Sequence, residues 1–239
     1  MRAILCGANG AMGKLIDEIL GDGIVGRVSI DGENNVPKTF EELGLVEADV
    51  IIDFSHHTAV ADVLAYAKKT GAAAVIGTTG HTAEEKEMIT AAAEEIPVFF
   101  SGNMSLGIAV LCRLAKQAAA AFPDADIEIV EAHHTRKVDA PSGTALMLFN
   151  AIKEVRPEAV ANCGRSGEGK RTREEIGIHA LRMGSVVGIH EIHIHTGNQS
   201  LTLKHESGSR AMLADGAAEA AKFMVGKPVG FYNMESMLG

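Results

Sequence analysis

Four side chains that can carry positive charge lie within five residues, at His133, His134, Arg136 and Lys137. The turn Pro141-Ser142-Gly143-Thr144 follows them and has the composition of a helix start. Cationic side chains and the N–H groups at a helix N-terminus both bind anions, and a histidine exchanges protons near neutral pH. The segment therefore predicts an anion site that contains an acid–base group. The alternative is a solvated basic loop.

A second candidate binding site is the glycine-rich turn Gly7-Ala8-Asn9-Gly10-Ala11-Met12-Gly13. Glycine lets a backbone turn tightly and approach a pyrophosphate, and the N-terminus of the following helix attracts that anion. Glycine turns also join strands to helices for steric reasons alone. Because this turn lies between a predicted strand and a predicted helix, we interpret it as a dinucleotide-binding turn.

Asp31 is predicted to end the second strand, about 20 residues after the glycine turn, where a carboxylate accepts hydrogen bonds from the adenosine ribose of a dinucleotide. The alternative is an ordinary turn at Asp31-Gly32. A carboxylate repels a 2′-phosphate, so NADH is favoured over NADPH. The positive charges of Lys38 and Arg27 would also allow NADPH to be used.

Three further loops follow predicted strands, at Asp53-Phe54-Ser55, Gly77-Thr78-Thr79-Gly80 and Ser101-Gly102-Asn103-Met104. Ligands of open α/β sheets bind at the carboxyl ends of the strands. Small side chains and backbone donors in these loops suit a nicotinamide ribose and ring. Each loop taken alone is equally consistent with a plain connection between a strand and a helix.

The elements that must position these residues fall into two groups. In the first, short apolar runs alternate with helical stretches, which predicts a parallel sheet with both faces covered. We expect strands over 3–6, 27–30, 50–54, 73–76 and 98–100, and helices over 14–20, 59–70 and 83–95. This pattern predicts an α/β, Rossmann-type domain over residues 1–104, completed by residues 211–239, because the helix predicted over 211–225 can pack on the sheet.

The second group, residues 105–210, is predicted to be an α+β domain with a mixed sheet. We expect helices over 107–121 and 144–153, a strand over 127–132, and strands over 178–181, 185–194 and 199–206 in hairpin-like succession. The glycine- and charge-rich stretch 164–175 is predicted to be a mobile loop, either a lid over an anionic substrate or an ordinary surface loop.

Composition excludes several function classes. The chain has 22 Lys and Arg against 31 Asp and Glu, a net charge of −9, with no Trp and two Tyr, so nucleic-acid or anionic-membrane partners are disfavoured. Cys6, Cys112 and Cys163 form no C-x-x-C pair, which fits a reducing cytoplasm. His193 and His195 share a strand face without a third ligand, so we expect a polar sheet face and no metal.

Taken together, these motifs resemble the 4-hydroxy-tetrahydrodipicolinate reductases (dihydrodipicolinate reductases) of lysine biosynthesis. The resemblance spans nearly the whole chain and departs from the family pattern at Thr135-Arg136. It rests on the segments Gly7 to Gly13, Gly77 to Gly80, Glu131 to Ala145, Glu175 to Ala180, Val187 to Glu191 and Ser209-Arg210.

The resemblance implies an oxidoreductase that transfers hydride from NADH or NADPH to a cyclic dicarboxylate imine, giving tetrahydrodipicolinate in the diaminopimelate pathway. His133 would be a proton donor or acceptor and Lys137 the proton donor. The implied substrate-binding residues are His134, Ser142, Gly143 and Thr144. The implied cofactor-binding residues are Gly7, Ala8, Asn9, Gly10, Ala11, Met12, Asp31, Gly77, Thr78, Thr79, Ser101, Gly102, Asn103 and Met104. A homotetramer assembled through the sheets of the second domain is also implied.

Two other functions remain open from the sequence. One is a non-catalytic redox sensor that binds NADH, and the other is a dehydrogenase of the same architecture that acts on a different small acid. A sensor has no use for a proton donor, so His133 and Lys137 favour an enzyme.

Overall fold

The computed structural model covers residues 1–239 and divides into two units. The first unit contains Met1–Ser105 and Ala211–Gly239, and the second contains Leu106–Arg210. The chain therefore leaves the first unit, builds the second, and returns to complete the first. None of the helices combines the length and the apolar character that a membrane crossing requires.

A six-stranded parallel sheet forms the centre of the first unit, in the order β11-β5-β4-β3-β1-β2. Its strands are β1 (Ala3–Cys6), β2 (Ile24–Val28), β3 (Val50–Asp53), β4 (Ala73–Ile76), β5 (Pro97–Phe100) and β11 (Gly230–Tyr232). Every residue of β1, β3 and β4 is buried, because helices cover both faces of the sheet. The predicted Rossmann-type parallel sheet is confirmed.

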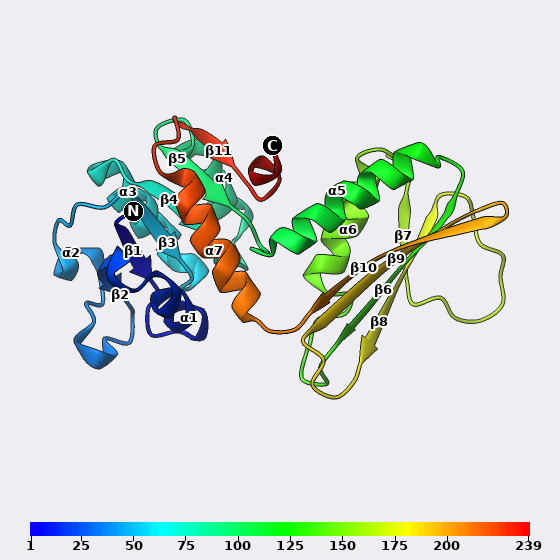
Figure 1. Ribbon diagram of the computed structural model, residues 1–239, viewed down its shortest axis with the longest axis horizontal. Helices are drawn as coiled ribbons and strands as arrows, with labels where there is room; N and C mark the ends of the chain where they lie inside the picture. Colours follow the sequence, from blue (N-terminus) through cyan, green and yellow to red (C-terminus); the bar gives the residue numbers. More distant parts are fainter. The chain divides into compact units, whose positions relative to one another are not determined.

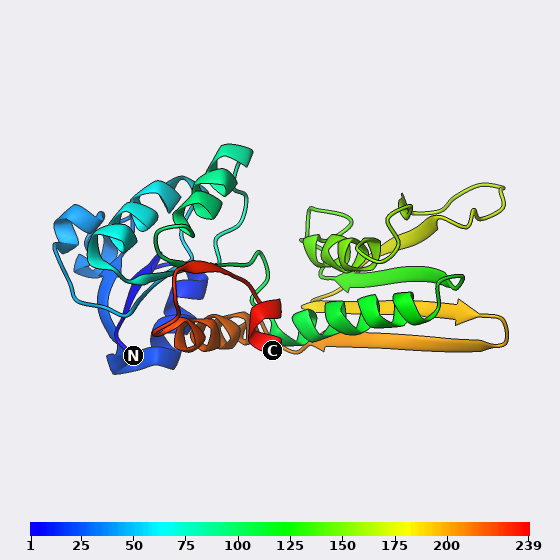
Figure 2. The same cartoon turned by 90° about the horizontal axis from the view of Figure 1, so that it is seen from above.

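The helices of the first unit lie in two layers, with α1 and α7 on one face of the sheet and α3 and α4 on the other (Figures 1 and 2). Their bounds are α1 (Ala11–Leu20), α2 (Phe40–Leu43), α3 (Val60–Thr70), α4 (Ala83–Ala92) and α7 (Ala211–Met224), with short 3-10 turns at η1 (Gly21–Gly23), η2 (Glu33–Asn35), η3 (His57–Ala59) and η4 (Glu235–Leu238). Helix α7 packs on β3, β4 and β5, as the sequence predicted for the last helix. Its buried alanines and Gly216, which lies against the Met104 carbonyl, allow this close approach.

The second unit contains a five-stranded mixed sheet in the order β10-β9-β6-β8-β7, also as predicted. Its strands are β6 (Asp126–His133), β7 (Val160–Cys163), β8 (Glu175–Arg182), β9 (Gly188–Thr196) and β10 (Gln199–Ser207), and its helices are α5 (Leu106–Ala121) and α6 (Gly143–Lys153). Both helices lie on the same face of the sheet (Figure 1). Isoleucines that alternate along β6 and β9, such as Ile127, Ile129, Ile192 and Ile194, fill the core beneath them.

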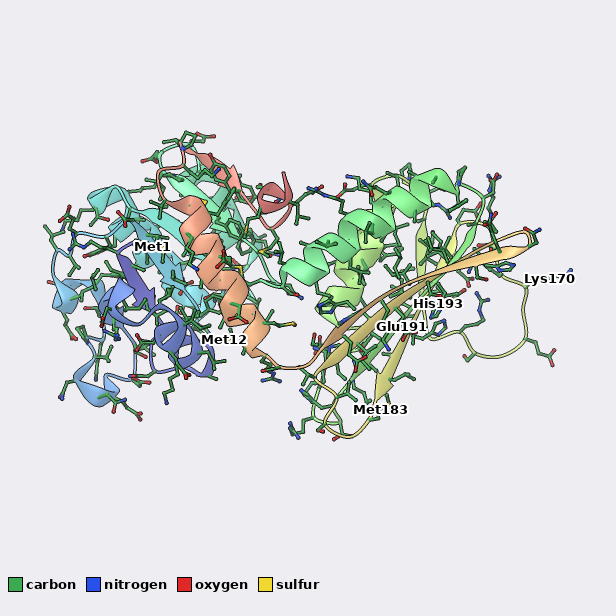
Figure 3. The ribbon with its side chains drawn as sticks, in the orientation of Figure 1. Met1, Met12, Lys170, Met183, Glu191 and His193 are labelled. Carbon is green, nitrogen blue, oxygen red and sulfur yellow. The ribbon has the colours of Figure 1, made fainter.

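The expected hairpin-like succession of β8, β9 and β10 is only partly right. Strands β9 and β10 form an antiparallel pair, but β6 lies between β8 and β9. The connection 183–187 therefore crosses the end of β6, where the Met183 N–H donates to the His133 carbonyl at 2.8 Å and the Thr135 N–H donates to the Gly184 carbonyl at 3.2 Å. Met183 is labelled at this end of the sheet in Figure 3. The local pattern missed this arrangement because β6 pairs with both strands from far away in the chain.

The second strand was also misplaced. It ends at Val28 and not at residue 30. The Gly7 and Ala8 N–H groups both donate hydrogen bonds to the Val28 carbonyl, and the chain then turns. The Gly32 N–H closes that turn on the Ser29 carbonyl at 3.0 Å. Asp31 consequently lies in a turn beyond the strand. The short strands β7 and β11 were missed because they carry no continuous buried apolar run.

Candidate functional site

His133 is the last residue of β6, and a buried carboxylate fixes its ring. Its Nδ1 lies 2.6 Å from Oε2 of Glu131, which is fully buried. Arg182 of β8 donates to both oxygens of this carboxylate, at 2.8 Å each, and the Ser142 N–H donates to Oε1 at 3.0 Å. Burial alone raises the pKa of Glu131, but the hydrogen bonds from Arg182, His133 and Ser142 outweigh it and hold that pKa below its usual value. The carboxylate is therefore ionised at neutral pH.

A second buried histidine packs against the first. The ring of His190, from β9, meets the ring of His133 edge-on with centroids 5.1 Å apart, and its Nε2 lies 3.2 Å from the Ser142 hydroxyl. Burial lowers the pKa of His190 to about 4, so this residue is neutral at pH 7. The Ser142 hydroxyl also caps α6 by accepting from the Ala145 N–H. The substrate-binding role of Ser142 remains a prediction.

Lys137 lies in the loop between β6 and α6, and its ammonium binds a carboxylate of its own chain. Its Nζ lies 2.8 Å from Oδ1 of Asp139, and this contact lowers the pKa of Asp139, with a smaller contribution from the Gly143 N–H. Gly143 begins α6, followed by Thr144, and a Cβ built on Gly143 would meet no atom within 4 Å. Lys137 and the start of α6 thus converge on one carboxylate, as an anion site requires.

His134 is held by a cation from the end of the second unit. Nη2 of Arg210 donates to Nε2 of His134 at 3.1 Å, across 76 residues of chain. The pKa of His134 is lowered by burial and then by the positive charges of Arg136 and Arg210. His134 is therefore a neutral acceptor, and Arg210 adds a guanidinium to which the sequence had assigned no role.

The glycine-rich turn of the first unit has the geometry that a pyrophosphate needs. Gly7 has a φ of +85°, and a Cβ there would overlap the Phe54 carbonyl, while a Cβ on Gly13 would overlap the Gly7 carbonyl. Gly10 is the N-cap of α1 and no side chain caps this helix. The N–H groups of the first turn, from Ala11 onward, have no intrahelical acceptors and remain to bind an anion. These residues fit a dinucleotide.

A cavity of about 330 Å³ lies in the first unit, at the carboxyl ends of its strands. It is lined by Met12, Phe54, Ser55, Gly77, Thr78, Thr79, Gly102, Asn103, Met104 and Leu213. Helix α1 and the loops after β3, β4 and β5, all expected to line the cofactor site, are thus brought together. Ser101 shapes the last loop, because its hydroxyl donates to the Asn103 carbonyl at 2.7 Å. Leu213 was missed, since only the return of α7 to this sheet brings it here.

A buried polar cluster supports this cavity from below. Asp53, at the end of β3, is fully buried, and its Oδ1 accepts from the N–H and hydroxyl of Ser55 at 3.1 and 2.5 Å. The Ser55 N–H also donates to the Thr78 hydroxyl at 2.9 Å, which ties two of the lining loops together. Burial raises the pKa of Asp53, and burial together with Asp53 raises the pKa of the Cys6 thiol to about 12.

Asp31 is oriented by the glycine turn. Asn9 Nδ2 and the Glu33 N–H donate to its Oδ1 at 2.5 and 3.0 Å, and these bonds lower the pKa of Asp31. Arg27 is bound to Asp17 by two hydrogen bonds, at 3.0 and 2.5 Å. Lys38 packs along Gly32, beside the turn that carries Asp31. An ionised carboxylate with Lys38 and Lys14 nearby is therefore present where the adenosine ribose was expected.

The loop 164–174 is tied to its own sheet. Its arginines bind acidic residues of the same unit, including Arg165 with Glu175 and Arg171 with Glu128 at 2.6 Å, while Lys170 lies on the loop (Figure 3). This network favours the surface-loop interpretation over the lid.

Two histidines of β9, His193 and His195, have polar neighbours on the helix-free face of the sheet. His193 lies on this strand with Glu191, 3.2 Å from its carboxylate (Figure 3). His195 Nδ1 lies 2.9 Å from the Ser200 hydroxyl. No group of three or more His, Cys, Asp or Glu side chains in the structure is arranged to hold a metal ion.

Comparisons with known proteins cover the whole chain. The family model described as dihydrodipicolinate reductase, N-terminus, matches residues 1–104, and the model described as dihydrodipicolinate reductase, C-terminus, matches residues 107–238. The 4-hydroxy-tetrahydrodipicolinate reductase of Clostridium tetani is 41% identical over 247 aligned positions, which cover 100% of this chain and 97% of that protein. The corresponding protein of Caldanaerobacter subterraneus is 42% identical, with 100% and 98% covered.

Solved structures agree in fold. A dipicolinate-bound dihydrodipicolinate reductase from Paenisporosarcina sp. TG-14 gives a TM-score of 0.78 at 24% identity and covers 98% of this chain and 97% of that one. An aspartate dehydrogenase from Thermotoga maritima gives a TM-score of 0.51 at 13% identity, with 96% and 98% covered.

Proposed function

The chain belongs to the dihydrodipicolinate reductase family, and from this premise we propose how its residues divide the work of the reaction. Its activity is the NAD(P)H-dependent reduction of 4-hydroxy-tetrahydrodipicolinate in diaminopimelate and lysine biosynthesis. The observation that carries the proposed residue roles is the convergence of Lys137 and the N-terminus of α6 on one carboxylate, beside a histidine held by a buried glutamate.

Bound NAD(P)H supplies the hydride, and the residues of this chain supply charge and protons. Overall, the conversion adds a hydride and a proton to the ring and releases water. Lys137 donates the proton from Nζ, and His133 exchanges protons through Nε2, the ring nitrogen that Glu131 leaves unused. The Lys137 ammonium also stabilises the negative charge that develops as the ring accepts the hydride.

The substrate carries two carboxylates, and the second unit offers matching positions. The Asp139 carboxylate stands where a substrate carboxylate would bind, between Lys137 and the Gly143 N–H. Thr144 extends this position along the first turn of α6, and His134 with Arg210 supplies a further cationic contact. Ser142 holds the start of the helix in place.

NADH is the preferred cofactor in this proposal. The lowered pKa of Asp31 keeps a negative charge where NADPH would place its 2′-phosphate, while Lys38 allows some use of NADPH. Gly7 to Met12 hold the pyrophosphate, and the loops from Gly77 and Ser101 hold the nicotinamide end. Replacing Asp31 by Ser should move the ratio of kcat/KM for NADPH over NADH by about tenfold, or 1.4 kcal/mol. A tenfold preference of the unaltered enzyme for NADPH would overturn this assignment.

We also propose that the chain is cytoplasmic and assembles as a homotetramer through the helix-free face of its second sheet. Leu181 is half-exposed on that face, and Lys204 of β10 pairs with Glu191 of β9 farther across the sheet. Size-exclusion chromatography with light scattering tests the assembly. The variant Leu181→Glu should lower the oligomeric state, and an unchanged elution would remove this face as the interface.

The experiment that tests the function is a coupled assay. Aspartate semialdehyde and pyruvate are condensed by the upstream synthase, and oxidation of NADH or NADPH is followed by absorbance after this protein is added. We expect consumption that depends on both carbon substrates. No consumption above background with either cofactor would refute the function.

A further inference from the structure

We propose that Glu131 is a positioning residue, which fixes His133 in the tautomer that leaves Nε2 free to accept a proton, and that Arg182 keeps Glu131 in the charged form this requires. The inference rests on the acid–base role proposed for His133. It concerns a carboxylate and a guanidinium that lie 51 residues apart in the chain and meet across β6 and β8.

The first step follows from the donors around the carboxylate. Glu131 is fully buried and accepts from the Ser142 N–H, from both Arg182 nitrogens and from His133 Nδ1. An ionised carboxylate only accepts hydrogen bonds. The 2.6 Å contact therefore places the imidazole proton on Nδ1, and the lone pair of the neutral ring is on Nε2.

The second step concerns the role of Arg182. A buried carboxylate without a cation takes up a proton, because desolvation disfavours its charged form. A protonated Glu131 would donate to Nδ1, which would move the proton of the neutral imidazole to Nε2 and remove its acceptor. The two hydrogen bonds from Arg182, both 2.8 Å, prevent this and so determine the direction in which His133 can exchange a proton.

The third step is the space around Nε2. A Cβ on Gly188, the first residue of β9, would lie 3.2 Å from that nitrogen, so glycine keeps this side of the ring uncrowded. The edge-on partner His190 is neutral at pH 7 and adds no charge. The titratable and charged groups facing this pair of histidines are Glu131, Arg182, Lys137, His134 and His205.

The variant Glu131→Gln tests the proposal, because glutamine keeps the shape and loses the charge. We expect kcat to fall about 10- to 100-fold, within the range that acid–base catalysis contributes, while the KM for substrate and the Kd for NADH change less than threefold. The pH profile of kcat/KM should also differ from that of the unaltered enzyme, because the carboxylate beside the reacting imidazole has lost its charge.

Glu128→Gln is the matched control. Glu128 lies on the same strand, and its carboxylate also contacts a histidine, His179 Nε2 at 2.8 Å, and an arginine, Arg171 at 2.6 Å. It lies on the opposite face of the sheet from Glu131. This face is also the proposed subunit interface, so the comparison uses Glu128→Gln samples whose elution on size-exclusion chromatography is unchanged. We expect kcat and the pH profile of these samples to match those of the unaltered enzyme. A Glu131→Gln variant that behaves like the control would overturn the proposal.

A direct measurement needs neither activity nor a folded variant. Nitrogen-15 NMR of the ring nitrogens of His133 in the unaltered, ligand-free protein should show, for the neutral ring, a protonated Nδ1 and an unprotonated Nε2. The reverse assignment would overturn the role of Glu131 even if the enzyme is fully active. If the coupled assay shows no activity and this tautomer is found, the proposed function fails and the positioning by Glu131 stands.

Discussion

The two candidate binding regions of this protein use different chemical groups, backbone N–H groups in one and ionisable side chains in the other. The glycine turn of the first unit offers backbone N–H groups, and its requirement is the absence of side-chain atoms at Gly7, Gly10 and Gly13. The His133 region offers ionisable side chains, whose states depend on buried partners from other strands. The first region should therefore be sensitive to added volume and insensitive to pH, and the second should respond to charge and to protons.

The largest effect should come from removing a reacting charge in the second unit. Lys137→Ala should lower kcat about 10²- to 10⁴-fold, the usual contribution of a positioned proton donor. The Kd for NADH should be unchanged, because the residues proposed to bind the nucleotide are in the other unit. Stopped-flow kinetics and fluorescence titration measure the two quantities.

Lys153→Ala, at the exposed end of α6, is the control for this charge removal and should change neither quantity. Equal losses of turnover and of NADH affinity in Lys137→Ala would contradict the separation of roles.

A single added methyl group should weaken ligand binding in one region without affecting the other. Gly10→Ala keeps an ordinary φ of −69°, and its Cβ would lie 3.1 Å from the Gly7 carbonyl, so the fold should survive. The methyl group would stand where the pyrophosphate approaches, and we expect the Kd for NADH to rise about 10- to 100-fold, which is roughly 1.4–2.7 kcal/mol.

Gly143→Ala is the counterpart of Gly10→Ala in the second unit, where a Cβ meets no protein atom. It should raise the KM for the dicarboxylate and leave the Kd for NADH unchanged. Loss of NADH binding in both variants would show that the two anion sites are not independent.

Acidification should weaken the second unit through His190. Its pKa of about 4 lies below the usual 6.5, so between these values the unfolded chain binds more protons than the folded one. Stability is therefore complete above about pH 6.5 and is lost as the pH falls toward 4, by about 1–2 kcal/mol between pH 7 and pH 5. Urea unfolding followed by circular dichroism should show this loss of unfolding free energy. In His190→Gln the free energy of unfolding should depend less on pH.

Tyrosine fluorescence supplies the matching measurement for the other unit, because Tyr66 and Tyr232 both lie in the first unit. His190→Gln should not change the pH dependence of the urea unfolding transition that tyrosine fluorescence reports. An identical pH slope in His190→Gln and in the unaltered protein would exclude His190 as the cause.

The smallest effect concerns the cysteines. Cys163, exposed at the end of β7, should react rapidly with an aromatic disulfide reagent, while Cys6 should react only after unfolding. Burial and Asp53 raise the pKa of Cys6 to about 12, so almost no thiolate is present at neutral pH. Mass spectrometry of peptides labelled at successive times measures both rates. Early labelling of Cys6 would contradict the closed polar cluster beneath the cavity.

Local features of this fold could be read from the sequence. The glycine turn, the loop from Gly77 and the Ser-Gly-Thr start of α6 each depend on a few consecutive residues, and the structure has them between the expected elements. Most strands and helices were also placed within three residues of their observed ends. These elements have strong periodicity or continuous apolar runs.

What the sequence did not reveal depends on pairing between distant segments. Arg182 reaches Glu131 because β8 pairs with β6, Arg210 reaches His134 across 76 residues, and Leu213 joins the cavity through α7. The insertion of β6 between β8 and β9 likewise depends on pairing between distant segments. No local pattern encodes which strand becomes the neighbour of which, so the partners of His133 emerged only from the fold.

The division of the first unit into two chain segments has a consequence for synthesis. When residues 1–105 leave the ribosome, β11 and α7 do not yet exist, so β5 is an open edge and the faces of β3, β4 and β5 that α7 later covers are bare. Residues 106–210 are continuous and can be completed first. The nascent chain therefore holds an incomplete sheet until its last segment arrives, and exposed edges of this kind are where aggregation begins and chaperones bind.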